Sequence, residues 1–450
     1  MKLAADVDVL VVGGGAAGVC AALAAARSGA STFLVEQSNA LGGVAGSGGH
    51  GHISIFCANG TDTRVVGGIP YEIIERLYRD EKAGRMEPIG IWFEVEKLKF
   101  LLEKMIVGNG IRLLYHTFFC ETVMDGGTVL GAVIQNKDGR GWIRAKRVVD
   151  CTGDGDVAAS AGAEFELGRP EDGRCQPMTL MFTVGGVDWP AVVRHRPDYE
   201  MRSIWELARK NGDMEPFQSK VMGFWWTPTR PDQVCVNFTH VTGRDGTRAA
   251  DLTAATIEAR RQAFQAVGVF RKYVKGMEDC HLVSTAASVG VRETRRITGD
   301  LTLSAQDVVS GRIWPDSIGY GAFFIDIHNL EGPGMDRNTW HPPTGFRYTI
   351  PYRILLPREI DGLLVAGRCA SVDHIALGSL RVMAQCGVMG EAAGTAAALS
   401  IQSGVSPRDV SIPALQGALR ARNAIVDEAD IARVNAEWPW AFPRDAPRQG

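Results

Sequence analysis

Apolar and polar residues near the start of the chain alternate in a way that predicts a strand, a turn, a helix and a second strand. Four apolar residues, Val9–Val12, precede a glycine-rich turn, and an alanine-rich stretch runs from about Ala17 to Ser28. A further apolar run, Thr32–Glu36, follows. Short apolar runs bounded by turn residues are typical of buried strands, and the stretch between them is long enough for a helix.

The next part of the chain changes from helical to strand-like spacing of apolar residues. Helices are predicted over Tyr71–Ala83 and Glu94–Val107. The strands predicted after them are Arg112–His116, Phe118–Met124, Val129–Gln135, Trp142–Ala145 and Arg147–Cys151. Glycine turns between the middle strands favour a small antiparallel β-meander, inserted before a last parallel strand at Arg147–Cys151.

The pattern changes again at about residue 168. Longer loops and aromatic-rich strands continue to about residue 348, with one polar helix near Thr253–Tyr273. A buried strand, Gly362–Gly367, and a helix of small residues, Ser379–Leu399, then resume the earlier pattern. A chain of 450 residues is also long for one ordinary domain, so at least two domains are expected.

The amino-acid composition argues against several classes of function. Hydrophobic residues make up 45% of the chain and charged residues 22%, as in a soluble globular protein. A net charge of −3 gives no electrostatic basis for a nucleic-acid or anionic-membrane partner. The nine cysteines are scattered without CxxC or zinc spacing, so we expect reduced thiols and no metal site. Neither a signal peptide nor a membrane span is recognisable, and we expect a cytoplasmic location.

The glycine turn carries the most specific chemical signal. Gly13, Gly15 and Gly18 have the spacing of a dinucleotide-binding fingerprint, between a predicted strand and a predicted helix. In such turns a pyrophosphate lies at the helix N-terminus, where free N–H groups and the helix dipole favour negative charge. Glu36 ends the second strand and would accept a ribose hydroxyl, which favours FAD or NAD over NADP.

These patterns together predict an α/β protein with a Rossmann-like, three-layer nucleotide-binding domain. Its parallel sheet and β-meander would come from residues 1–165 and 349–405. An α+β substrate domain, residues 166–348, would be inserted between them, and residues 406–450 would form a C-terminal helix and tail. Glycines concentrated between Leu41 and His52 indicate backbone pressed against a flat or bulky ligand such as a flavin ring.

With these motifs in place, the chain resembles FAD-dependent oxidoreductases of the glutathione-reductase-like class that are distantly related to fumarate reductase flavoproteins. The resemblance rests on the fingerprint, Leu41–Gly43, Val148–Asp156 and Gly290–Asp300. It rests equally on Ile350–Pro357 and Gly362–Leu399, and it extends to about residue 400. It implies non-covalent FAD but not a substrate, because this fold supports many chemistries.

The resemblance also implies which residues hold FAD. The fingerprint would bind the pyrophosphate, Phe119 and Cys120 would flank the adenine, and Gly153 would lie beside the phosphates. A helix starting near Ser379 would direct its N-terminus at the flavin. Arg368 departs from the family, because many members carry an acid at that position. The full predicted set is Gly13, Gly15, Ala16, Ala17, Gly18, Glu36, Gln37, Gly42, Gly43, Ser47, Gly48, Phe119, Cys120, Gly153, Gly367, Arg368, Ser379, Leu380 and Arg381.

Flavin chemistry also needs a proton acceptor and groups that bind an anionic substrate. The candidate histidines are His50 and His52 in the glycine-rich loop, His328 at the end of an apolar strand, and His374 before the small-residue helix; His240 ranks lower. A covalent flavin link at His50, His52 or Cys57 is a minor alternative.

Arginines in the segment GVRETRRITGD supply the candidate cations. Strand alternation would place Arg292 and Arg296 on one side, and Arg295 with Glu293 on the other. Arginine suits bidentate binding of carboxylate or phosphate, although ion pairing with Glu293 or Asp300 is an equal alternative.

The leading hypothesis is therefore dehydrogenation of a small polar organic substrate by hydride transfer to FAD. A reductase of activated C=C or C=O bonds and a flavin-bound electron-transfer or structural partner remain alternatives. No second nucleotide fold is visible, so oxygen, a quinone or a carrier protein would reoxidise the flavin. The sequence leaves the oligomeric state open, including a homo-oligomer.

Overall fold

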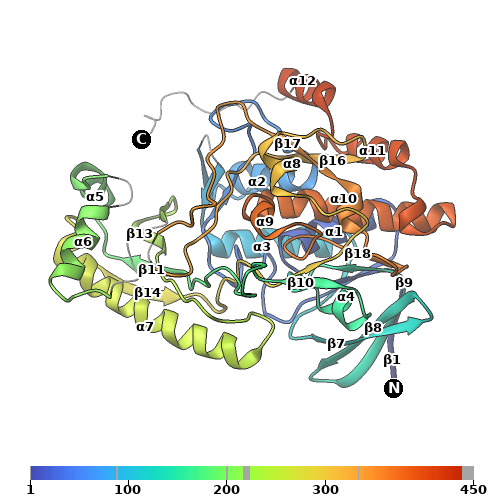
Figure 1. Ribbon diagram of the computed structural model, residues 1–450, viewed down its shortest axis with the longest axis horizontal. Coiled ribbons are helices and arrows are strands. Elements are labelled where there is room, and N and C mark those ends of the chain that lie inside the picture. Colours follow the sequence, from blue (N-terminus) through green and yellow to red (C-terminus); the bar gives the residue numbers. More distant parts are fainter. Residues whose placement is uncertain (1, 88–89, 199–200, 216–222, 333, 438–450) are drawn as a thin grey trace.

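The structure, a computed structural model, describes residues 2–87, 90–198, 201–215, 223–332 and 334–437 (Figure 1). Its main sheet has five parallel strands in the order β6 (Arg112–Leu114), β2 (Thr32–Val35), β1 (Lys2–Val12), β9 (Gly139–Asp150) and β18 (Leu363–Val365). The predicted α/β fold with a Rossmann-like parallel sheet is confirmed.

The β-meander forms from β7 (Phe118–Asp125), β8 (Thr128–Asn136) and the first half of β9, all antiparallel. The sequence predicts two strands, Trp142–Ala145 and Arg147–Cys151, but the structure has one continuous strand there. The reason is that β9 has different partners along its length. Its first half pairs with β8, its second half with β18, and β1 runs along both.

Helices α1 (Ala16–Arg27) and α10 (Met383–Ser403) pack tightly together in one layer, with α2 (Gly68–Arg79) and α3 (Val95–Gly108) beside them. Close approach of α1 and α10 depends on two glycines. A Cβ atom on Gly390 would collide with the Ala17 carbonyl, and one on Gly394 with the Ala21 carbonyl. Glycine, which has no side chain, lets the two helix backbones approach this closely.

A second lobe, at the left of Figure 1, has its own sheet and core. Its strand order is β12 (Gly223–Thr227), β13 (Arg230–Asn237), β11 (Phe182–Gly185) and β14 (His281–Thr285). Helices α5 (Trp189–His195), α6 (Arg202–Lys210) and α7 (Ala249–Tyr273) belong to the same lobe, with Trp205 and Phe270 at its centre.

Core residues between Leu303 and Leu356 pack with α1 and α10 rather than with this second lobe. Thus part of the segment predicted as substrate domain, residues 166–348, lies against the nucleotide-binding core. The proposed division of the chain into domains remains a prediction.

The small-residue helix is interrupted. Instead of one helix over Ser379–Leu399, the structure has α9 (His374–Leu380) and α10, separated at Arg381–Val382. Asp373 begins α9 by accepting a hydrogen bond from the Ala376 amide at 2.6 Å. The extended backbone of Val382 separates the two helices, and the Arg381 side chain at this break pairs with Asp326.

The remaining elements are short. The strands are β3 (His52–Ser54), β4 (Gly84–Glu87), β5 (Gly90–Phe93), β10 (Phe165–Leu167), β15 (Arg295–Ile297), β16 (Ser317–Gly321) and β17 (Tyr348–Pro351). The helices are α4 (Asp156–Ser160), α8 (Ala305–Val309), α11 (Ile412–Arg420) and α12 (Glu428–Glu437), with 3-10 turns at Tyr352–Leu355 and Pro407–Asp409. Residues 438–450 of the predicted tail lie outside the described residues.

Candidate functional site

The glycine turn between β1 and α1 has the conformation that the fingerprint predicts. Gly13 has φ of +98°, and a side chain there would meet the carbonyl of Cys151, while one on Gly18 would collide with the carbonyl of Gly13. Gly15 differs, since its nearest neighbour would be the Cα of Gly43 at 3.9 Å. Protein packing therefore requires Gly13 and Gly18, whereas Gly15 leaves room at the α1 N-terminus for a ligand to approach the backbone.

Glu36 lies beside this turn with its carboxylate already oriented. Its two oxygens accept hydrogen bonds from the Gly14 amide at 2.6 Å and the Ser38 amide at 2.7 Å. A carboxylate has about four lone-pair sites, so Glu36 retains capacity for a ribose hydroxyl. Neighbouring Gln37 is exposed.

Gly153, Gly367 and Arg368 form the opposite side of the turn. A Cβ on Gly367 would lie 3.2 Å from the Cβ of Ala17, next to Ala16 at the start of α1. Arg368 crosses Gly153 and donates hydrogen bonds to Asp154 at 2.9 Å and Thr294 at 2.8 Å. The arginine that departs from the family pattern is thus held by an aspartate beside the turn.

The glycine-rich loop is compact because it folds onto itself and onto the turn. Gly42 donates to the Gly14 carbonyl at 2.8 Å, and Gly43 lies against Gly15. Gly48 packs on the backbone of Val44, and the Ser47 hydroxyl donates to Ser38 at 2.8 Å. These contacts place Gly42, Gly43, Ser47 and Gly48 near the turn, and their predicted contact with a flavin ring remains a prediction.

Other predicted FAD residues occupy mixed positions. Phe119 is partly buried in β7 and Cys120 is exposed. The Ser379 hydroxyl is used within the protein, because it donates to the Phe323 carbonyl at 2.6 Å and bonds Tyr348. Ser379 and Leu380 lie at the end of α9, so the long helix whose N-terminus was predicted to face the flavin begins instead at Met383.

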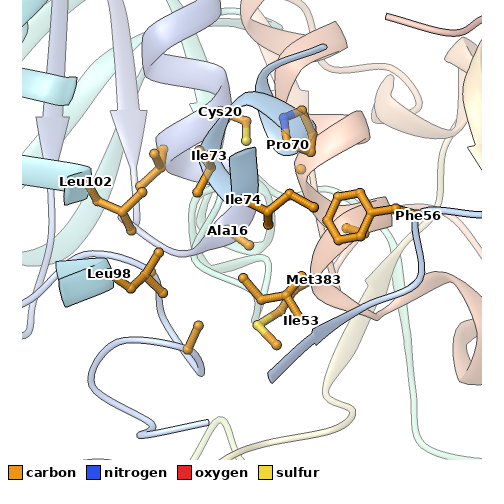
Figure 2. A pocket seen from close by; sticks show the side chains of 15 residues that line it. Ala16, Cys20, Ile53, Phe56, Pro70, Ile73, Ile74, Leu98, Leu102 and Met383 are labelled. Carbon is orange, nitrogen blue, oxygen red and sulfur yellow. The ribbon is translucent and has the colours of Figure 1, made fainter. Parts of the chain in front are cut away.

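An apolar cavity lies behind the turn (Figure 2). Its wall includes Ala16 from α1, Gly42 and Ala45 from the glycine-rich loop, and Met383 and Ala384 from α10. The other lining residues are Val19, Cys20, Ile53, Phe56, Pro70, Ile73, Ile74, Leu98, Leu102 and Gly387. None of the described residues that line this cavity is charged, so it belongs to the apolar core under the nucleotide turn.

Charged and imidazole groups meet elsewhere, where three distant segments of the chain converge. Arg292 donates to the Pro177 carbonyl at 2.6 Å and the Thr179 hydroxyl at 2.7 Å. Arg381, between α9 and α10, donates to the Asp326 carboxylate at 2.9 Å. Asp326 also lies 3.3 Å from Nε2 of His328. We call these four residues, Arg292, Asp326, His328 and Arg381, the buried charged cluster.

Burial controls ionisation in this cluster. Burial, and after it the charge of Arg292, lowers the pKa of His328 to about 3. Burial would raise the pKa of Asp326, but His328 and Arg381 hold it well below its usual range. Burial and the nearby Arg381 lower the pKa of Arg292 to about 9. At neutral pH the cluster therefore holds two guanidinium cations, one carboxylate and a neutral imidazole.

Three further histidines border the cluster. Burial lowers the pKa of His240 and of His50 to about 4, with a smaller contribution from Arg292 in each case. His50 and His52 lie against the ring of Trp225, at centroid distances of 4.4 and 5.3 Å. Burial also lowers the pKa of His52, to about 3. The predicted residues Arg292, His328 and Arg381 therefore come together, while His50 and His52 pack with each other and with Trp225.

Arg296 and His374 lie in a different network. Both contact Glu293, Arg296 through an ion pair and His374 through Nδ1 at 2.8 Å. Arg296 also donates to Glu166 at 3.0 Å and to the carbonyls of Gly168 and Val372. The network accounts for both side chains structurally, and their catalytic role stays a prediction.

The predicted alternation of the arginines is wrong. Residues 291–294 are not in a strand, and β15 begins only at Arg295. Glu293 pairs with Arg296, while Arg295 binds Asp156 at 2.8 Å. Ion pairs, rather than strand alternation, determine which way Glu293, Arg295 and Arg296 point.

Sequence reasoning missed Asp326 and Trp225. Asp326 precedes His328 by two residues in an extended segment held by bridges from Ile325 to Trp340 and from His328 to Met335. That spacing puts two side chains on one face of an extended chain, and it was the available signal. Trp225 gave no such signal, because its place beside the glycine-rich loop depends on tertiary packing.

Neither a metal site nor a membrane span is found among the described residues. They contain no group of three or more histidine, cysteine, aspartate or glutamate side chains arranged to hold a metal ion. Within the same residues, no helix combines the length and the apolar character needed to cross a bilayer.

Comparison with solved structures gives distant similarities. The chain is 16% identical to a geranylgeranyl bacteriochlorophyll reductase-like protein from Thermoplasma acidophilum, covering 96% of both chains with a TM-score of 0.49. It is 14% identical to p-nitrophenol 4-monooxygenase from Pseudomonas putida, covering 97% of this chain and 93% of the other with a TM-score of 0.47. No curated protein sequence matches the chain significantly.

The family comparison is more direct. The family model described as FAD dependent oxidoreductase matches residues 8–419, which include the turn, the glycine-rich loop and the buried charged cluster. The structure fits the cofactor that this family uses, since the space over Gly15 and the orientation of Glu36 suit a dinucleotide. The expectation of FAD as cofactor is thus confirmed, and the chain belongs to the FAD-dependent oxidoreductase family.

Proposed function

We propose that the protein dehydrogenates a small polar organic molecule at the buried charged cluster, with FAD as the hydride acceptor. The observation that carries this proposal is His328, a buried imidazole whose Nε2 lies 3.3 Å from the Asp326 carboxylate. A neutral imidazole can accept the proton of a hydroxyl or amine as a C–H hydride departs. Bound FAD supplies the two-electron acceptor for this reaction.

Asp326 supports His328 as a positioning residue. Its carboxylate lies between His328 and Arg381, so it both orients the imidazole and favours the imidazolium that forms on proton transfer. Cluster and nucleotide turn are joined by the α9–α10 segment, because Arg381 lies two residues before the start of α10 at Met383. Substrate and cofactor are therefore expected on either side of that segment.

A reductase of activated C=C or C=O bonds is the second candidate. The buried cations Arg292 and Arg381 favour it, because fixed positive charge stabilises an anion that develops on a carbonyl or carboxylate. Enzyme reduced with dithionite would then be reoxidised by such acceptors. The physiological electron acceptor of the dehydrogenase, whether oxygen, a quinone or a carrier protein, is likewise a proposal.

The test is anaerobic bleaching of the flavin absorption in the wild type and in His328→Asn. Hydroxy acids, polyols, sugars and amines are the substrates to try. We expect one class to bleach the wild type, and His328→Asn to bleach about 10²–10⁴ times more slowly. His195→Asn, an exposed histidine on α5, serves as the matched control and should behave as the wild type.

Two results would contradict the proposal. Equal bleaching rates in wild type and His328→Asn would remove the histidine from the chemistry. A wild-type protein that no organic substrate bleaches, but that exchanges electrons rapidly with a partner protein, would favour the electron-transfer alternative.

A further inference from the structure

We infer that the substrate of this protein carries a carboxylate, which binds between Arg292 and Arg381 while His328 faces the neighbouring carbon. The inference deepens the proposed function and relies on it only for the oxidation step. The binding site itself rests on the contacts and the charge of the buried cluster.

The contacts leave both arginines incompletely paired. The described residues provide no ion pair for Arg292, whose only protein hydrogen bonds go from Nη1 to a carbonyl and a hydroxyl. Arg381 uses Nη2 on Asp326, and its buried Nε has no hydrogen-bond partner within the part of the chain that is described. Each guanidinium therefore keeps donors for an external acceptor, and a carboxylate matches that planar geometry.

The charge balance points in the same direction. Two cations and one carboxylate leave the cluster with one positive charge, because the surrounding histidines are neutral. Arg292 and Arg381 are close enough for each to affect the ionisation of His328. Buried charge without a counter-charge is costly, so a ligand with one negative charge completes the site.

The reaction follows from this placement. With its carboxylate held by the arginines, the substrate presents an adjacent carbon that bears a hydroxyl or an amine. The C–H bond breaks and its electron pair leaves as hydride to bound FAD, while the O–H or N–H proton passes to Nδ1 of His328, because Nε2 faces the Asp326 carboxylate. The product is a 2-oxo acid, or the corresponding imine when the substrate is an amine.

Substrate binding would also prepare His328 for its role. Burial is the main reason for the low pKa of His328, and the charge of Arg292 is the next. A bound carboxylate offsets that charge and so raises the affinity of the imidazole for a proton. Molecules without a carboxylate would leave His328 in its less basic state.

The experiment compares matched pairs of ligands on the holoprotein. Glycolate and lactate are each paired with the diol of the same carbon skeleton, ethylene glycol and propane-1,2-diol. Binding is followed through the change in flavin absorption, and turnover through anaerobic bleaching. We expect at least one carboxylate to bind about tenfold or more tightly than its diol, as charge-assisted hydrogen bonds predict.

The variants Arg292→Gln and Arg381→Gln test the assignment. Each should weaken carboxylate binding about 10–100-fold and weaken diol binding much less, so the preference for the carboxylate should shrink. Arg260→Gln, an exposed arginine on α7, is the matched control. If Arg292→Gln does not fold, as judged by bound FAD and melting, then Arg292→Lys tests the loss of the planar fork alone.

The outcomes separate the two proposals. Carboxylates that shift the flavin spectrum through the arginines but never bleach it would support this inference and contradict the dehydrogenase. Bleaching by diols or other neutral molecules, with no preference for carboxylates, would support the dehydrogenase and overturn this inference. A carboxylate preference that survives in both glutamine variants would overturn it as well.

Discussion

Buried carboxyl groups in this protein are either ionised or protonated, and the neighbouring side chains decide which. Asp326 remains charged because His328 and Arg381 contact it directly. Glu391, in the middle of α10, has no ion pair in the described parts of the chain, and its Oε2 accepts only the Ile69 amide at 2.9 Å. Burial raises the pKa of Glu391 from its usual 4.5 to about 8, so it is largely protonated at neutral pH.

Glu391 predicts a dependence of stability on pH. Because its pKa is higher in the folded state, its contribution to stability is complete below about pH 4.5 and is lost as pH rises towards 8. Between these two pH values, the unfolding free energy should fall by up to about 1.4 kcal/mol for each pH unit. Glu391→Gln, which resembles the protonated form, should remove that loss and unfold at a higher temperature than wild type at pH 8.

Thermal melts from pH 5 to 8 provide the measurement, since the difference between variant and wild type should grow over this range. Glu96→Gln, at an exposed position on α3, is the control and should follow the wild type. A constant difference across the range would show that Glu391 is ionised in the folded protein.

Packing between α1 and α10 is the most sensitive feature at the scale of elements. Gly394→Ala would place a methyl group against the Ala21 carbonyl, which backbone movement alone can relieve. We expect this variant to lose about 1–3 kcal/mol of unfolding free energy. The matched control is Gly268→Ala in α7, where a Cβ meets nothing within 4 Å.

Gly268→Ala should gain up to about 1 kcal/mol, because alanine favours a helix over glycine when no contact opposes it. Denaturant unfolding of the two variants gives both values. Equal effects of the two substitutions would mean that helix propensity, rather than the contact between α1 and α10, determines the result.

Elements whose signals are local were predictable from the sequence. The end of β1, the start of α1 and the place of β2 were predictable from the run Val9–Val12, the glycine turn and the alanine-rich stretch. These features depend on residues that are neighbours in the sequence. The ion pair of Arg381 was not predictable, since its partner, Asp326, is 55 residues away in the sequence. Arg292 and Arg295 likewise contact partners far along the chain, and Arg296 combines the nearby Glu293 with the distant Glu166.

At the scale of the whole molecule, the predicted FAD residues connect parts of the chain that are distant in sequence. The turn at Gly13–Gly18, the loop at Gly42–Gly48, Gly153 and Gly367 all lie around the N-terminus of α1. The second lobe has a separate core and meets this region through contacts such as that of Cys235 with the Gly49 carbonyl. A ligand bound at the turn thus contacts several segments that are far apart in the sequence.

This arrangement predicts that FAD stabilises the whole fold and leaves the protein on acid precipitation. Burial raises the pKa of the Cys57 thiol to about 12, so it is not a thiolate nucleophile, and the rings of His50 and His52 are packed on Trp225. The melting temperature of the FAD-free protein should rise as FAD is added. The expected gain in unfolding free energy is about 2.7 kcal/mol at an FAD concentration of 100 times Kd.

Glu36→Ala should shift this titration to higher FAD concentration, because the ribose hydroxyl loses its acceptor. Glu96→Ala, on the exposed face of α3, should leave the titration unchanged. Yellow colour retained in the acid pellet would contradict non-covalent binding, and an unaltered titration for Glu36→Ala would remove the ribose contact from that carboxylate.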